Sequence, residues 1–102
     1  METKKEILRD AIQYQQNSIV SRQIIKKPNG NVTLFAFDKD ESLSEHTSPF
    51  EALINIVEGS MEITIGGNLF TVEEGEILLL PPDIPHGLIA LQKTKMLLTM
   101  IK

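Results

Sequence analysis

The chain contains only two histidines, and each stands where a strand-forming stretch meets a turn. His46 follows Ser44 and Glu45 just ahead of an apolar stretch. His86 closes the segment 75–86, which runs from a glycine turn through an apolar strand to a proline-rich corner. Imidazole binds metal ions and exchanges protons near neutral pH. The two histidines therefore predict a site for metal binding, proton transfer or ligand binding if the fold brings their rings together.

The composition excludes several classes of site. The 102 residues include no cysteine, which rules out disulfides, thiolate catalysis and zinc–thiolate centres. The net charge of −4 argues against a general nucleic-acid binder, which needs a basic face. The amino terminus has no apolar signal segment, and no run approaches the length of a membrane span. We therefore expect a single-domain cytoplasmic protein with no nucleic-acid partner and no membrane attachment.

One helix and a series of strands are predicted to position the histidines. Thr3 and Glu6 fit a capping box, and apolar residues then recur at helical spacing. The sequence thus predicts a short amphipathic α-helix near residues 4–13. Beyond it, short apolar stretches alternate with turn signals such as Asn29-Gly30 and Gly66-Gly67, which favour strands joined by hairpins.

These strands predict an all-β architecture. Seven or eight short strands at close spacing, with no helix between them, are typical of an antiparallel barrel or sandwich. We expect residues 1–30 to form the N-terminal helix and an edge strand, and residues 31–102 to form the barrel. Several strands, such as the stretch 77–80, are apolar on both faces, whereas a strand of a lone double sheet usually has one polar face. A subunit interface explains them better than cover by one short helix.

The residues leading to His86 form a spaced pattern. Gly75, Pro81 and His86 are separated as glycine, five residues, proline, four residues and histidine. This spacing resembles the second motif of the cupin superfamily, specifically of its small single-domain, conserved-barrel members. Asp83 takes the place of that motif's second glycine, and aspartate tolerates a left-handed backbone better than most residues. Ala90 takes the place of its closing asparagine.

The residues around His46 resemble the first cupin motif in part. That motif contains a His-x-His pair, a glutamate and a hairpin glycine. Ser44 takes the place of the first histidine, His46 that of the second and Gly59 that of the glycine. The place of the glutamate is open, because counting forward from His46 reaches Glu51, whereas counting back from Gly59 reaches Ala52.

The resemblance covers roughly residues 32–100 and implies a jelly-roll, or double-stranded β-helix, barrel that commonly forms homodimers. It also implies a divalent metal, which could be Fe, Mn, Ni, Cu or Zn, held by three histidines and one glutamate. A β-bulge that turned Glu51 inward would complete a reduced set of two histidines and one carboxylate, formed by His46, Glu51 and His86. With Ala52 inward, only the two histidines remain.

Two main functions follow from these expectations. The first is a small-molecule binding module without turnover, whose ligand pocket is formed by Ser44, His46, Ile54, Ile56, Phe70, His86 and Leu88. The second is a metal-dependent enzyme of dioxygenase, decarboxylase or isomerase type that uses the reduced ligand set. A third is an isomerase or epimerase without metal, in which a histidine acts as base. Alternatively, both histidines only form hydrogen bonds to neighbouring carbonyl groups.

Overall fold

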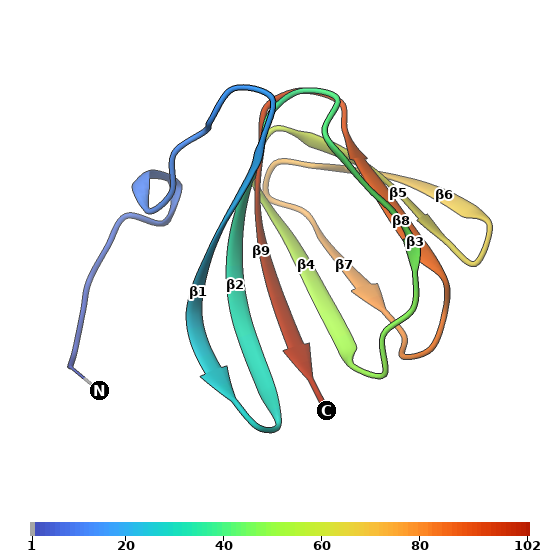
Figure 1. Cartoon of the computed structure of the whole chain (residues 1–102), viewed down its shortest axis with the longest axis horizontal. Coiled ribbons are helices and arrows are strands. Elements are labelled where there is room, and N and C mark those ends of the chain that lie inside the picture. The colour runs from blue at the N-terminus through green and yellow to red at the C-terminus, as the bar shows by residue number, and fades with distance from the viewer. Residues whose placement is uncertain (1) are drawn as a thin grey trace.

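The computed structural model describes residues 2–102 and consists of two antiparallel β-sheets (Figure 1). The larger sheet contains, in order, β1 (Ile19–Lys27), β2 (Gly30–Phe37), β9 (Thr94–Ile101), β4 (Glu51–Glu58) and β7 (Ile77–Leu80). The smaller sheet contains, in order, β3 (Ser42–His46), β8 (His86–Ala90), β5 (Ser60–Ile65) and β6 (Asn68–Glu73). The two sheets enclose one core, and the predicted all-β jelly-roll barrel is confirmed.

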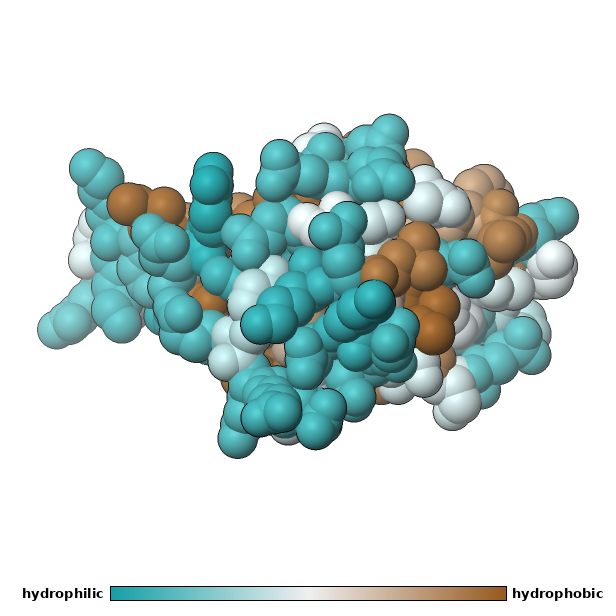
Figure 2. Space-filling model, turned by 90° about the horizontal axis from the view of Figure 1, so that it is seen from above, coloured by the Kyte–Doolittle hydropathy of each residue, from teal (hydrophilic) through white to brown (hydrophobic). Residues whose placement is uncertain are grey.

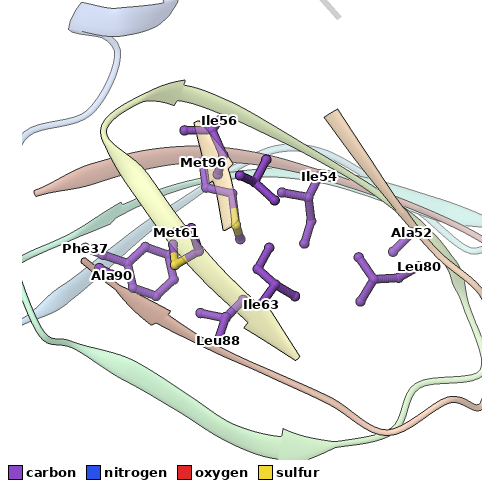
Figure 3. Packing of buried hydrophobic residues seen from close by; sticks show 11 residues of the cluster. Phe37, Ala52, Ile54, Ile56, Met61, Ile63, Leu80, Leu88, Ala90 and Met96 are labelled. Atoms are coloured by element: carbon purple, nitrogen blue, oxygen red, sulfur yellow. The ribbon is translucent and has the colours of Figure 1, made fainter. Parts of the chain in front are cut away.

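Alternation of side chains along the strands explains how the core forms. In β4, Ala52, Ile54 and Ile56 are buried while the residues between them face outward. In β5, Met61 and Ile63 follow the same alternation. Figure 3 shows these side chains converging between the sheets with those of the neighbouring strands. The middle of the barrel is therefore filled by side chains, and it is not a channel.

The predicted α-helix near residues 4–13 is wrong, because a single 3-10 turn at Leu8–Asp10 takes its place. The capping box does not form, since Glu6 instead pairs with the guanidinium of Arg22 through two N···O contacts of 2.7 Å. An isolated helix of about ten residues is marginal in water. Packing does not compensate for this length, because Ile7 is 70% exposed. Within residues 2–102, no helix has the length and apolar composition needed to cross a membrane.

We call residues 2–18 the arm, and its second half lies against the outer face of the larger sheet. Ile12 is buried there against β2, and Lys95 of β9 donates a hydrogen bond to a carbonyl group of the arm. Tyr14 donates its hydroxyl proton to Glu58 at 2.7 Å. Burial, together with this hydrogen bond to the carboxylate, raises the pKa of Tyr14, so the phenol stays protonated and remains a donor. Figure 1 shows the first half of the arm standing apart from β1.

One end of the barrel is closed where β5 of the smaller sheet meets β9 of the larger one. The Thr94 hydroxyl accepts a hydrogen bond from the backbone N–H of Ser60 at 3.1 Å, and both residues are buried. We call this contact the Ser60–Thr94 junction. Beside it, Gly59 has a φ of 97°, and a Cβ at this position would clash with the carbonyl oxygen of Lys93. The backbone at Gly59 thus approaches β9 too closely for any side chain.

Two glycine substitutions separate this steric effect from backbone strain. Gly67 also has a positive φ, 84°, but a Cβ there meets no atom within 4 Å. We expect Gly67→Ala to lower the free energy of unfolding by about 1–2 kcal/mol, which is the cost of a left-handed alanine. Gly59→Ala adds an overpacking cost of roughly 1–3 kcal/mol. Urea denaturation followed by circular dichroism measures both variants, and equal losses would contradict the close approach at Gly59.

Candidate functional site

The two histidines lie side by side on neighbouring strands of the smaller sheet. His46 ends β3 and His86 begins β8, and they are direct cross-strand partners. Their ring centroids are 4.3 Å apart, with an angle of 62° between the ring planes. His86 also pairs with Ile65 of β5, on the side of β8 away from β3. Ile65 is the last residue of β5, whereas Ser60 is its first. The histidine pair therefore occupies the end of the barrel opposite the Ser60–Thr94 junction, which we call the mouth.

Each imidazole ring is held by its own strand. The Nδ1 atom of His46 lies 2.8 Å from the carbonyl oxygen of Ser44, and that of His86 lies 3.0 Å from the carbonyl oxygen of Ile84. A carbonyl oxygen only accepts, so both Nδ1 atoms carry the proton and donate it. The expected bonds to neighbouring carbonyl groups are thus present. Because Nδ1 is protonated, Nε2 of each neutral ring is an acceptor, and neither Nε2 has a partner within residues 2–102.

The proline-rich corner before His86 is fixed at two points. Asp83 has a φ of 64°, the left-handed conformation expected at this position of the motif. Its backbone N–H donates to the carbonyl oxygen of Ser48 at 2.8 Å, which ties the corner to the loop before β4. The carbonyl oxygen of Pro85 accepts from the N–H of Gly66 at 2.8 Å, which ties it to the β5–β6 hairpin. These bonds set the position from which His86 enters β8.

A β-bulge in β3 decides which side chains face the mouth. The register of β3 with β8 shifts between Leu43 and His46. Both of these side chains line the pocket although they are three residues apart, because the extra residue offsets the alternation. Regular alternation would put the Ser44 side chain on the same side of β3 as the His46 side chain. Ser44 is instead exposed and outside the pocket, and it contributes its carbonyl oxygen to the site.

A pocket of about 70 Å³ opens at the mouth. It is lined by Leu43, His46, Ser48, Phe50, Ala52, Ile54, Leu80, Pro81, His86, Leu88, Leu98 and Met100. The two imidazoles are the only titratable side chains of this lining, and the Ser48 hydroxyl is its only other polar side chain. His46 is exposed and His86 is half-buried. The site is therefore an apolar recess with two imidazoles at its rim.

Four of the seven predicted pocket residues line this recess, namely His46, Ile54, His86 and Leu88. Besides Ser44, two predicted residues do not. Ile56 points to the interior as expected but lies deeper, beside Met96, where the core is filled. Phe70 is 41% exposed on the edge strand β6.

The open position in the first motif is occupied by alanine. Ala52 lines the pocket, whereas Glu51 is exposed and faces the opposite side of β4. The pairing of β4 with β9 runs without a shift through both residues, so no bulge turns Glu51 inward. The predicted set of His46, Glu51 and His86 is therefore not brought together. Within residues 2–102, no group of three or more His, Asp or Glu side chains is arranged to hold a metal ion.

Several residues of the lining escaped the sequence prediction. Alternation from Met96 would have identified the apolar β9 residues Leu98 and Met100. Ser48 and Phe50 belong to an irregular segment, and its sequence pattern does not predict which way their side chains point. Their place in the pocket follows only from the tertiary structure.

Comparisons with known proteins agree with this geometry. Residues 33–102 match the family model described as the cupin domain. A conserved protein of unknown function from Streptococcus pyogenes is 31% identical with a TM-score of 0.94, and the match covers 100% of this chain and 90% of that one. A cupin 2 conserved barrel domain protein from Leptotrichia buccalis is 35% identical with a TM-score of 0.87, over 92% of this chain and 46% of that one.

A third structure shows the fold alone. A variant of salicylate 1,2-dioxygenase from Pseudoaminobacter salicylatoxidans is 11% identical with a TM-score of 0.75, over 81% of this chain and 26% of that one. A search of the curated proteins found none that is similar. The family match over residues 33–102 and the jelly-roll topology lead to one conclusion. The chain belongs to the cupin family.

Proposed function

We propose that this protein is a binding module that holds a small neutral hydroxyl compound at the barrel mouth, without catalytic turnover. The observation that carries the proposal is a pair of imidazoles, 4.3 Å apart, at the rim of an otherwise apolar recess. Both Nε2 atoms accept hydrogen bonds when the rings are neutral, so the ligand must supply a donor. The apolar lining, which includes Leu43 and Leu88, favours a hydrocarbon body on that ligand.

The fixed orientation of the rings supports binding. The hydrogen bonds from Nδ1 to the carbonyl groups of Ser44 and Ile84 hold each imidazole before a ligand arrives, so less conformational entropy is lost on binding. The gain per hydrogen bond stays modest, at about 0.5–1.5 kcal/mol, because the ligand replaces water at a partly exposed rim.

The size of the recess limits the ligand and its affinity. One water molecule needs about 10–15 Å³ of cavity volume. The pocket of 70 Å³ therefore accommodates roughly five non-hydrogen atoms. The best small ligands gain about 1.5 kcal/mol per non-hydrogen atom. Five atoms therefore correspond to a dissociation constant in the micromolar range at best. This range suits a module that responds to abundant metabolites and does not suit tight storage.

The metal that the family resemblance implies does not fit this donor set. Ser44 is outside the recess and Ala52 stands where a carboxylate would be needed, so the lining offers two imidazole nitrogens only. Catalytic metal sites use about three protein ligands. The alternative of a metal-dependent dioxygenase, decarboxylase or isomerase therefore lacks its third ligand, and the dioxygenase neighbour supports it only at the level of fold.

Metal titrations test this fit. We expect Ala52→Glu to raise the affinity for Zn²⁺ at least about tenfold, because it adds a carboxylate to the same recess as both histidines. Glu51→Gln is the matched control, and it should leave the Zn²⁺ affinity unchanged because Glu51 faces away from the pocket. Isothermal titration calorimetry on untagged protein measures both variants. A loss of metal affinity in Glu51→Gln would support the metal site formed by His46, Glu51 and His86.

A pair of isomeric probes tests the binding function. Butan-1-ol and methyl propyl ether have the same atoms, but only the alcohol donates a hydrogen bond. We expect the alcohol to bind at least about fivefold more tightly, which corresponds to one hydrogen bond of about 1 kcal/mol. His46→Phe and His86→Phe, which keep a ring but remove the acceptor, should abolish this preference. Titrations followed by the NMR signals of residues that line the mouth measure the affinities.

Ser44→Ala is the control for these titrations, because the Ser44 side chain lies outside the recess and its carbonyl group is retained. This variant should keep the preference for the alcohol. Equal binding of both probes to the unmodified protein, or turnover of a substrate that depends on a bound metal ion, would contradict the proposed function.

A further inference from the structure

Ser48 is the third polar group of the recess, and its hydroxyl group has a proton to donate. The hydroxyl oxygen accepts a hydrogen bond from the backbone N–H of Phe50 at 3.2 Å. A hydroxyl group has two lone pairs and one proton, so this bond leaves the proton unused. Within residues 2–102, the Ser48 hydroxyl forms no other hydrogen bond. Its O–H is therefore available to a ligand in the pocket that Ser48 lines.

The backbone of Ser48 fixes its position at the rim. The carbonyl oxygen of Ser48 accepts a hydrogen bond from the N–H of Asp83 at 2.8 Å, which joins the loop before β4 to the corner that leads into β8. His46 lies shortly before Ser48 in the chain, and His86 lies shortly after Asp83. The hydroxyl donor and the two imidazoles therefore come from three segments that meet at the mouth.

The mouth thus combines two acceptors with one donor beside an apolar lining. The acceptors are the Nε2 atoms of His46 and His86, and the donor is the Ser48 hydroxyl. The end of the molecule seen from above in Figure 2 has a mostly hydrophilic surface, with apolar side chains in separate patches. At the mouth, by contrast, the polar groups stand around a recess lined by apolar side chains such as Leu43 and Leu88. The recess can therefore distinguish ligands by their pattern of donors and acceptors.

A ligand with a single hydroxyl group does not satisfy this set of polar groups. It donates one hydrogen bond, so it pairs with one Nε2 atom and leaves the other to water. A carboxylate fits worse, because it only accepts and would place its lone pairs against those of two neutral imidazoles. Two hydroxyl groups supply both donors, and either of their oxygen atoms can accept from Ser48. The hydrogen-bonding pattern therefore favours a diol.

We propose that the mouth selects small compounds with hydroxyl groups on two adjacent carbon atoms, and that the Ser48 hydroxyl determines this specificity together with the two imidazoles. This selection rests on the proposed function, because the neutral imidazoles must first accept hydrogen bonds from a ligand. Ring centroids 4.3 Å apart bring both acceptors within reach of one molecule, at hydrogen bonds of about 2.7–3.0 Å. Adjacent hydroxyl groups can lie on one side of such a molecule, so its carbon atoms face the apolar lining. A recess for roughly five non-hydrogen atoms has room for propane-1,2-diol.

A set of isomeric probes tests this selection on the unmodified protein. Propane-1,2-diol, propane-1,3-diol, 2-methoxyethanol and dimethoxymethane contain the same atoms but differ in the number and spacing of their hydroxyl groups. We expect propane-1,2-diol to bind at least about fivefold more tightly than 2-methoxyethanol, and 2-methoxyethanol at least about fivefold more tightly than dimethoxymethane, because each step removes one hydrogen bond. Propane-1,3-diol should bind no more tightly than 2-methoxyethanol. NMR titrations of the residues that line the mouth measure the affinities.

The outcomes separate this inference from the proposed function. Equal binding of propane-1,2-diol and 2-methoxyethanol would overturn the selection of diols, and equal binding of the two diols would overturn the requirement for adjacent hydroxyl groups. If butan-1-ol still binds more tightly than methyl propyl ether, only the inference fails and the proposed function stands. If that preference is also absent, the proposed function fails with it.

Substitutions of Ser48 test its role as the donor. We expect Ser48→Ala to weaken the binding of propane-1,2-diol at least about fivefold, whereas Ser48→Thr, which keeps the hydroxyl group, should bind it as the unmodified protein does. Thr47→Ala is the matched control, because Thr47 is exposed beside Ser48 and outside the pocket. In Ser48→Ala the diol should still bind more tightly than 2-methoxyethanol, since that difference depends on the imidazoles. Circular dichroism verifies that each variant is folded, and an unchanged diol affinity in folded Ser48→Ala would overturn the role of Ser48.

Discussion

The close approach of the two sheets at the Ser60–Thr94 junction is the constraint on which the rest of the barrel depends. A backbone-to-hydroxyl hydrogen bond links β5 to β9 there, and the backbone at Gly59 lies against Lys93 with no room for a side chain. Because the sheets meet at this end, their side chains fill the middle of the barrel. The pocket between the sheets lies at the opposite end, where β3 and β8 carry the histidines.

Much of the fold could be predicted from local patterns. Short apolar stretches predicted the strands and the turn residues marked the hairpins, because both signals depend on neighbours in the chain. The arm could not be predicted in this way. Its apolar spacing is helical, but a helix of about ten residues is marginal in water, and Glu6 pairs with Arg22, sixteen residues away, instead of capping the helix. A distant partner therefore overrode a local propensity.

The candidate site was predicted in outline, but its lining was not. The motif spacing placed both histidines at strand ends, and the structure brings their rings to 4.3 Å. The prediction that the Ser44 side chain lines the pocket depended on regular alternation, which the bulge in β3 interrupts. The choice between Glu51 and Ala52 depended on the register of β4 with β9, and register is a property of strand pairing that spacing along one strand does not contain.

Because of the same bulge, the residues that line the mouth can change while the strand pairing beside the core stays the same. The pairs Ser42 with Ile89 and Leu43 with Leu88 lie on the core side of the bulge and keep a regular register. A one-residue deletion near residues 44–45 would turn a different side chain toward the recess and leave those pairs in place. Changes in chain length at this one point thus offer a route to new ligand preferences that substitution in a close-packed interior does not.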